Sequence, residues 1–300
     1  MTNAAKQPAK THMQSATSVL ARAIAFVLVL VASGSARAQT FTVLYTFTNT
    51  ADGEQPDASL FLDAAGNLYG TTQYGGTKGG FGTVFRLNTK GREVVLRSFA
   101  GTPDGDDPYA GLLRDKAGNL YGTTQYGGFN GGYGTVFKLD PKGKLSLLHS
   151  FAGTPDGVNP LAGLLRDAAG NLYGTTYYGG TNGGFGTVFK LNTKGKLTLL
   201  HSFAGLPVGQ NPYSRLIRDS AGNLYGTTFY GGTTGYGTVF KLDTAGKLTV
   251  LHSFNDVPDG AHSIGGLVLD KAGNLYGTTS DGGDLSCGFS GCGTVFKVTP

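Results

Sequence analysis

One seven-residue string, GNLYGTT, occurs five times, and its copies begin at Gly66, Gly118, Gly170, Gly222 and Gly273. Successive copies are 52, 52, 52 and 51 residues apart. A fixed period of this length indicates a repeat architecture, in which each unit buries its apolar surface only against its neighbours. Whatever one unit folds into, all five must therefore fold alike.

The repeat at 161–203 contains four short apolar segments separated by turn-forming residues. These segments are residues 164–167, 171–176, 187–191 and 197–203. None has the 3.6-residue apolar period of a helix. Four antiparallel strands per repeat define a blade of a β-propeller, so the sequence predicts an all-β fold of this class.

The two ends of the repeat array predict how the propeller closes. Residues 41–47, FTVLYTF, resemble the fourth segment of a repeat, whereas the chain stops after a third segment, GTVFKV at 293–298. Pairing the two segments completes a fifth four-stranded blade and leaves no unpaired sheet edge. We therefore predict a five-bladed β-propeller, four antiparallel strands per blade, in which the N-terminal strand closes the last blade.

Within the string itself, glycine in the middle of a strand needs an explanation, because glycine weakens a sheet. We expect a close neighbour above Gly174 and its equivalents, such as a side chain from the next blade. A structural role for GNLYGTT is favoured over a copied ligand site, since every blade needs the same packing unit.

Residues 1–38 have the pattern of a secretory signal peptide. Basic residues precede an apolar run at 23–34, and the triplet ARA follows at 36–38. A membrane anchor is the alternative, but this run of about twelve residues is shorter than the ~20 that a spanning helix needs. We expect cleavage after Ala38 and a secreted or periplasmic mature chain, 39–300, forming a single propeller domain without a membrane span.

Removal of the leader leaves 20 Lys and Arg residues against 19 Asp and Glu residues. The remaining basic residues are scattered along the chain, whereas a nucleic-acid binder should carry a basic patch. We therefore exclude nucleic acid as a partner, and we expect a monomer.

Cys287 and Cys292 lie in a loop of the last repeat that is about four residues longer than its counterpart in the first repeat. Beyond a signal peptide, in an oxidising compartment, a disulfide between them is expected. It would stabilise the fold by roughly 2 kcal/mol in the chain-entropy model. No nearby His or Cys completes a zinc site, so we expect no metal and no cofactor. The acidic cluster Asp104, Asp106 and Asp107 leaves calcium as a weaker alternative.

The glycine-rich loops and the crossovers between repeats form the candidate ligand-binding surface. The loop between the second and third segments and the crossover to the next repeat must lie on one face, and function concentrates on such loops. The candidates are Tyr74, Tyr126, Tyr178, Tyr230 and Asp281 at the starts of the loops, and Asp104, Asp156 and Asp259 in the crossovers. The alternative for the crossover aspartates is a turn in which each carboxylate bonds its own backbone.

No catalytic residues are predicted. His149, His201 and His252 each precede a serine, but adjacent strand residues point to opposite faces, so no Ser–His dyad forms. We expect these histidines to pack in the outer strands. The glycines are followed by a strand instead of the Lys-Ser/Thr and helix of a phosphate-binding loop.

The complete repeated pattern, D..GNLYGTT..GG....GTVFKL...G....L..F, resembles the GloVer-type (choice-of-anchor) tandem repeat of exported bacterial proteins. The resemblance implies an exported repeat protein, often with a C-terminal sorting anchor. The chain ends at Pro300 without an apolar tail, which argues against surface anchoring. We expect a non-catalytic exported binding module for carbohydrate or another envelope ligand. The alternative is a structural or protein-interaction scaffold of the envelope, and a polysaccharide-acting enzyme is less favoured.

Overall fold

The computed structural model describes residues 40–288 and 290–300, so the predicted signal peptide lies outside the described residues. The chain divides into two compact units, residues 1–44 and 45–300. Every strand belongs to the second unit.

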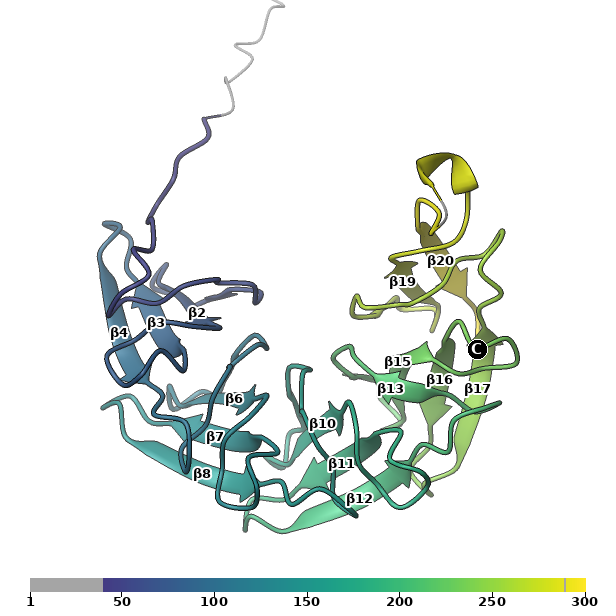
Figure 1. Ribbon diagram of the computed structural model, residues 1–300, viewed down its shortest axis with the longest axis horizontal. Helices are drawn as coiled ribbons and strands as arrows, with labels where there is room; N and C mark the ends of the chain where they lie inside the picture. The colour runs from purple at the N-terminus through teal and green to yellow at the C-terminus, as the bar shows by residue number, and fades with distance from the viewer. Residues whose placement is uncertain (1–39, 289) are drawn as a thin grey trace, which may run out of the picture. The chain divides into compact units, whose positions relative to one another are not determined.

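Five antiparallel sheets follow one another along the described part of the chain (Figure 1). The first sheet contains β1 (Phe61–Leu62), β2 (Leu68–Thr72), β3 (Thr83–Leu87) and β4 (Glu93–Ser98). The second contains β5 (Leu113–Arg114), β6 (Leu120–Thr124), β7 (Thr135–Leu139) and β8 (Leu145–Ser150). The third contains β9 (Leu165–Arg166), β10 (Leu172–Thr176), β11 (Thr187–Leu191) and β12 (Leu197–Ser202).

The last two sheets depart from four strands. The fourth sheet contains β13 (Gln210–Pro212), β14 (Ile217–Arg218), β15 (Leu224–Tyr230), β16 (Thr238–Leu242) and β17 (Leu248–Ser253). The fifth contains β18 (Val268–Leu269), β19 (Leu275–Thr279) and β20 (Thr294–Val298). Apart from the short 3-10 helix η1 (Leu285–Cys287), no helix occurs in the described residues, so the all-β prediction is confirmed.

The predicted closing strand is not observed. Residues 40–48 form no strand, and the fifth sheet ends at β20 with three strands. Val295 of this edge strand is 83% exposed. Residues 41–47 resemble a fourth strand in sequence, but this resemblance alone does not pair them with β20. Pairing also requires that the two segments lie within hydrogen-bonding distance. The structure thus contains five sheets without the predicted closure.

One apolar contact is repeated between consecutive sheets. The Phe that follows each outer strand packs edge to face against the Phe of the third strand in the next sheet. These pairs are Phe99–Phe137, Phe151–Phe189, Phe203–Phe240 and Phe254–Phe296, with ring centroids 5.1–5.3 Å apart. Phe47 packs against Phe85 of the first sheet in the same manner, at 5.0 Å. Phe47 therefore occupies the place that the end of an outer strand takes elsewhere.

The letters of GNLYGTT have structural roles in every repeat. In the third, Asp167 accepts hydrogen bonds from the backbone N–H of Asn171 at 2.8 Å and from the Tyr173 hydroxyl at 3.0 Å. Thr176 at the far end of β10 hydrogen-bonds the Thr187 hydroxyl of β11 at 2.8 Å. The motif therefore ties the strand at both ends, as the structural interpretation predicts.

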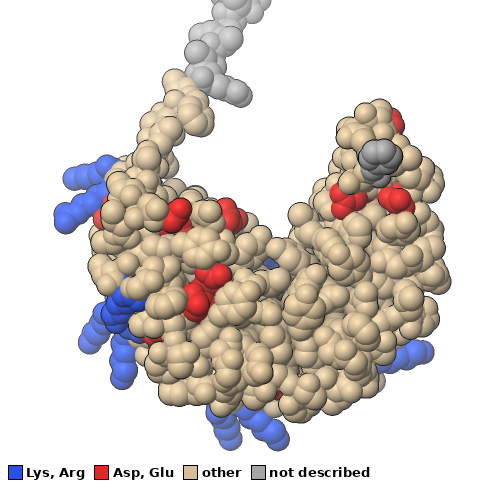
Figure 2. Space-filling view, viewed as in Figure 1, with Lys and Arg blue, Asp and Glu red and all other residues tan. Residues whose placement is uncertain are grey.

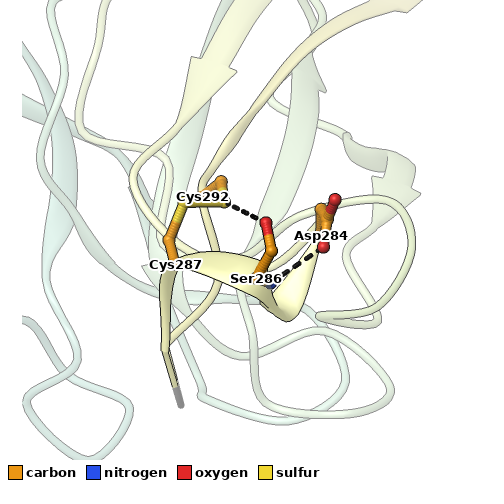
Figure 3. Close-up of a disulfide and its surroundings, with 4 residues drawn as sticks. All are labelled: Asp284, Ser286, Cys287 and Cys292. Atoms are coloured by element: carbon orange, nitrogen blue, oxygen red, sulfur yellow. Dashed lines mark hydrogen bonds between the residues drawn. A yellow bond between two sulfur atoms is a disulfide. The ribbon is translucent and has the colours of Figure 1, made fainter.

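Cys287 and Cys292 form the predicted disulfide, with Cα atoms 5.2 Å apart (Figure 3). The bond closes the loop around η1, whose N-terminus is capped by Asp284 accepting from the Ser286 N–H at 2.8 Å. A disulfide is typical of proteins from an oxidising compartment. Among the described residues, no helix is long and apolar enough to span a membrane.

The glycine in the middle of β10 lies beneath an aromatic ring. A Cβ on Gly174 would lie 2.6 Å from Cζ of Phe189 and 3.1 Å from Cδ2 of Leu164. Both neighbours are fully buried and belong to the same repeat, not to the next one as we expected. Phe189 thus fills the space above Gly174 and also packs edge to face against Phe151 of the preceding sheet.

We predict that Gly174→Ala destabilises the protein by about 2–3 kcal/mol, because the buried ring and leucine must both move. Urea unfolding of the chain from residue 39 measures the change. Gly266→Ala is the matched control, since its added Cβ meets nothing within 4 Å and its φ is not positive. Equal losses in the two variants would contradict the packing explanation.

Candidate functional site

Each glycine-rich loop begins beside a crossover. Backbone bridges join the two in four repeats, at Glu54 and Tyr74, Asp106 and Tyr126, Val158 and Tyr178, and Ala261 and Asp281. In the fourth repeat the same contact is made by β13, where Gln210 pairs with Tyr230. Figure 2 shows Asp and Glu side chains on the face toward the viewer, whereas most Lys and Arg side chains project from its margin.

Five polar residues at equivalent crossover positions have positive φ angles, between 55° and 58°: Gln55, Asp107, Asn159, Asn211 and His262. Non-glycine residues rarely adopt this conformation, and they concentrate at functional sites. Backbone hydrogen bonds hold it here: the His262 N–H donates to Tyr236 O at 3.0 Å, and its C=O accepts from the Ser280 N–H at 3.2 Å. Asp107, Asn159 and Asn211 likewise donate their N–H groups to carbonyls of the preceding repeat, so these four residues are held between two repeats.

His262 forms an acid–base dyad with Asp281. The His262 Nδ1 lies 2.8 Å from Asp281 Oδ2, and the Ser280 hydroxyl donates to the same carboxylate oxygen at 3.0 Å. The imidazole ring stacks on Phe229 with centroids 4.6 Å apart, and it packs edge to face with Tyr230, with centroids 5.2 Å apart. Three neighbouring side chains thus fix the orientation of the ring.

The hydrogen bond to Asp281 determines the chemistry of the ring. When Nδ1–H is donated to the carboxylate, the neutral imidazole carries its lone pair on Nε2. No described residue hydrogen-bonds Nε2, and this atom is not among the buried polar atoms that lack a partner. His262 can therefore accept a proton at Nε2 while Asp281 stabilises the imidazolium that results.

A second polar group lies where the first two repeats meet. Asp107 is 7% exposed, its Oδ1 has no partner among the described residues, and its Oδ2 receives only a 3.5 Å hydrogen bond from Gln73. Burial, together with the charge of Asp106, raises the pKa of Asp107 to about 6. Asp107 in turn is the main cause of a raised pKa at Tyr74.

The asparagines at the position of Asp107 in the third and fourth repeats show why an ionised carboxylate is unfavourable at this position. Asn159 and Asn211 donate through Nδ2 to the carbonyls of Gln125 and Tyr177, at 3.1 and 2.9 Å. A carboxylate has no proton to donate, whereas a protonated carboxyl has one.

The predicted tyrosines are all half-exposed, at 39–50%. The Tyr74 and Tyr126 hydroxyls accept hydrogen bonds from Gln73 and Gln125, each at 3.0 Å, and Tyr178 packs edge to face against Tyr177. Of the predicted loop residues, the structure brings Tyr230 and Asp281 together around His262.

The predicted crossover aspartates lie in turns, and neither His262 nor Asp281 is among their hydrogen-bond partners. Asp104, Asp156 and Asp259 accept from the backbone N–H groups of Ala100, Ala152 and Asn255 at 2.8–3.0 Å. They also pair with outer-strand side chains: Asp104 with Arg97, Asp156 with His149 at 2.8 Å, and Asp259 with His252 at 2.7 Å. These contacts are those of the turn alternative.

The outer-strand histidines hold these crossovers in place. His149 and His252 lie edge to face against Phe151 and Phe254. His201 has no acid to pair with because Val208 replaces the aspartate, and burial lowers its pKa. Within the described residues, no group of three or more His, Cys, Asp or Glu side chains could hold a metal ion.

Sequence reasoning missed His262. Its signal was available: the fifth repeat has His where the third and fourth have Asn, and Asp281 where the other four have Tyr. Two coupled departures in one repeat indicate a contact that the other repeats do not make.

The fold and loops define a propeller-like repeat protein. The model of the Gloeobacter/Verrucomicrobia repeat matches residues 31–183 and 128–300, and the chain belongs to this family. The resemblance to the GloVer-type repeat is thereby confirmed. No curated protein matches the chain.

Several solved structures are similar in fold. The extracellular domain of a protein described as a one-component system, from B. thetaiotaomicron, has a TM-score of 0.52 at 13% identity, covering 81% of this chain and 28% of that one. A luciferin-regenerating enzyme has a TM-score of 0.50 at 14% identity, covering 80% and 76%. A gluconolactonase from Xanthomonas campestris has a TM-score of 0.46 at 16% identity, covering 80% and 71%.

These likenesses correct the functional prediction made from the sequence. The prediction of a non-catalytic binding module, with an envelope scaffold as its alternative, is corrected, because the same fold occurs in a protein described as a luciferin-regenerating enzyme. At 13–16% identity the likeness extends to the fold alone, so it assigns no substrate.

We predict that Asp107→Asn stabilises the protein at pH 7.5 and has little effect at pH 4. The pKa of Asp107 is raised from 3.8 to about 6 on folding, so its ionisation destabilises the wild type as the pH rises through this interval. Removing the carboxylate should raise the free energy of unfolding at pH 7.5 by about 1–3 kcal/mol.

Urea unfolding at both pH values measures this effect, with the pH 4 values as the internal control. A gain of the same size at pH 4 and pH 7.5 would show that the stabilisation has another cause.

Proposed function

We propose that the protein is a hydrolase that acts on small neutral esters or lactones, with His262 as the general base. The main support for this proposal is the 2.8 Å contact between His262 Nδ1 and Asp281 Oδ2. His262 Nε2 has no hydrogen-bond partner among the described residues and is not buried. An imidazole oriented by a carboxylate is suited to remove a proton from water near neutral pH.

The proposed reaction needs one proton-transfer group. His262 Nε2 takes a proton from water while the water oxygen attacks the ester carbonyl carbon. The tetrahedral intermediate then collapses, the C–O bond to the alkoxide breaks, and the imidazolium returns the proton to the leaving oxygen. The products are a carboxylic acid and an alcohol, or one hydroxy acid from a lactone. Asp281 keeps the ring oriented and stabilises its positive charge throughout.

Aromatic side chains around the dyad favour a substrate with an apolar or ring-shaped body. Phe229 and Tyr230 contact the imidazole, and Tyr177 and Tyr178 of the preceding repeat lie edge to face, 4.6 Å apart. Such faces bind flat groups without requiring a charge. In this proposal Tyr178 and Tyr230 contact the substrate, and Tyr74 and Tyr126 extend the same aromatic loop surface.

The proposal places this activity outside the cytoplasm. The leader pattern at residues 1–38 and the Cys287–Cys292 disulfide support an exported protein, since disulfides persist in oxidising compartments. We therefore propose a secreted or periplasmic location, with cleavage after Ala38.

We also infer that the exported chain closes into a five-bladed ring through pairing of residues 41–47 with β20. The support is the packing of Phe47 against Phe85. This contact repeats the Phe–Phe contact that joins each of the four pairs of consecutive sheets. Tyr45 likewise donates to Asp52 at 2.9 Å, at the seven-residue spacing of the His149–Asp156 pair. The apolar edge of β20 would be covered by this pairing.

Hydrogen exchange tests the closure. In the chain that starts at residue 39, the β20 amides that do not pair with β19 should be protected at least about 100-fold, as in a paired strand. Deleting residues 39–44 should abolish this protection and leave that of β10 unchanged. Equal exchange at β20 in both proteins would refute the closure.

The His262→Asn substitution tests the hydrolase. Purified protein should hydrolyse members of a panel of p-nitrophenyl esters and small lactones at pH 8, and His262→Asn should lower kcat/KM at least about 100-fold, the usual contribution of a general base. Asp281→Asn should also lower it, because the ring loses its orientation.

His149→Asn is the matched control, since His149 also pairs with an aspartate but lies on an outer strand. Its activity should equal that of the wild type, and thermal melting should show that all variants fold. No hydrolysis of any panel member, or full activity in His262→Asn, would reject the proposal.

A further inference from the structure

A cavity of about 320 Å³ lies among the first segments of the repeats. Its lining includes Leu60, Tyr109, Leu161, Tyr213, Arg215 and Ile264, so each of the five repeats contributes to it. Arg215 is the one charged side chain among the described lining residues. The cavity adjoins the aromatic residues of the dyad, because the rings of Tyr213 and Phe229 lie 6.3 Å apart.

Arg215 breaks the pattern of the repeats. The equivalent residues in the other four are small: Ser59, Gly111, Gly163 and Gly266. The Arg215 side chain passes beside Gly163 of the preceding repeat, since a Cβ added there would be in van der Waals contact with Arg215 Cδ, at 3.7 Å. A long cation thus stands in one repeat where packing requires only a small residue.

The guanidinium of Arg215 has no acidic partner among the described residues. It takes part in none of the ion pairs and in no hydrogen bond there. Arg215 is an exposed residue that lines the cavity, so its charge is accessible to a ligand there. A cation that lines a concave cavity and has no counter-ion of its own attracts an anion that enters the cavity.

Two tyrosines add a hydrogen-bond donor to the cavity. The Tyr213 hydroxyl donates to the Tyr109 hydroxyl at 3.0 Å, and both rings line the cavity. Tyr109 therefore keeps its own hydroxyl proton for another acceptor. Leu60, Leu161 and Ile264 supply apolar walls, which suit an organic anion better than an inorganic one.

We propose that this cavity binds a small organic monocarboxylate, with the Arg215 guanidinium as its anchor and the Tyr109 hydroxyl as a second donor. A planar guanidinium matches a carboxylate with two parallel hydrogen bonds, and the apolar walls receive the body of the ligand. This inference does not rest on the proposed hydrolysis, and a binding measurement tests it without any turnover.

Calorimetry with benzoate, hexanoate and lactate provides the test, with benzamide as the neutral counterpart of benzoate. At least one carboxylate should bind, and benzamide should bind at least about 10-fold more weakly than benzoate if benzoate is that ligand, the expected cost of losing a charged hydrogen bond. Arg215→Gly, which restores the residue of three other repeats, should weaken carboxylate binding at least about 10-fold. Arg215→Lys should retain part of it.

His262→Asn should leave carboxylate binding unchanged, which separates this proposal from that of the hydrolase. Absence of binding by all three carboxylates, or equal binding by wild type and Arg215→Gly, would overturn the assignment. Inorganic phosphate that binds as tightly as the best carboxylate would also overturn it, because the cavity would then select charge alone.

Discussion

The structure depends on one aromatic contact, the phenylalanine that each third strand places between two sheets. Phe189 lies against Gly174 of its own sheet and packs edge to face with Phe151 from the preceding sheet. The absence of a side chain at Gly174 leaves room for the ring, and the buried ring then packs between the two sheets. Because the same contact recurs, every crossover and loop starts from an equivalent position.

This uniform framework makes departures from the repeat informative. Asp107, Arg215, His262 and Asp281 all stand at positions where other repeats carry a different kind of side chain. None of them is required for the contact between sheets, and each changes the charge or the proton chemistry of the loop face or the cavity. Function in such a protein is therefore sought in the differences between copies, whereas the identical letters belong to the framework.

Much of the framework could be predicted from the sequence, because its interactions are local. The Asp167 turn, the strands on either side of it and the Cys287–Cys292 bond all join residues close in the chain. The His262–Asp281 dyad could not be derived in this way, since it depends on how a crossover pairs with a loop 19 residues later. The recurrence of Asp104 has the opposite explanation, a local one. Asp104 pairs with Arg97 on the adjacent strand, so an aspartate recurs at this crossover position because it forms a turn.

The repeated contact between sheets also bears on how such a gene can change. Because each internal sheet meets the preceding sheet through its third-strand Phe and the next sheet through the Phe after its outer strand, loss or duplication of one 52-residue unit by recombination would recreate contacts of the same kind. No single interface between sheets therefore determines how many units the protein contains. That number is determined by how many copies of the repeat the gene encodes. A lineage could lengthen or shorten the array first and alter individual loop residues afterwards.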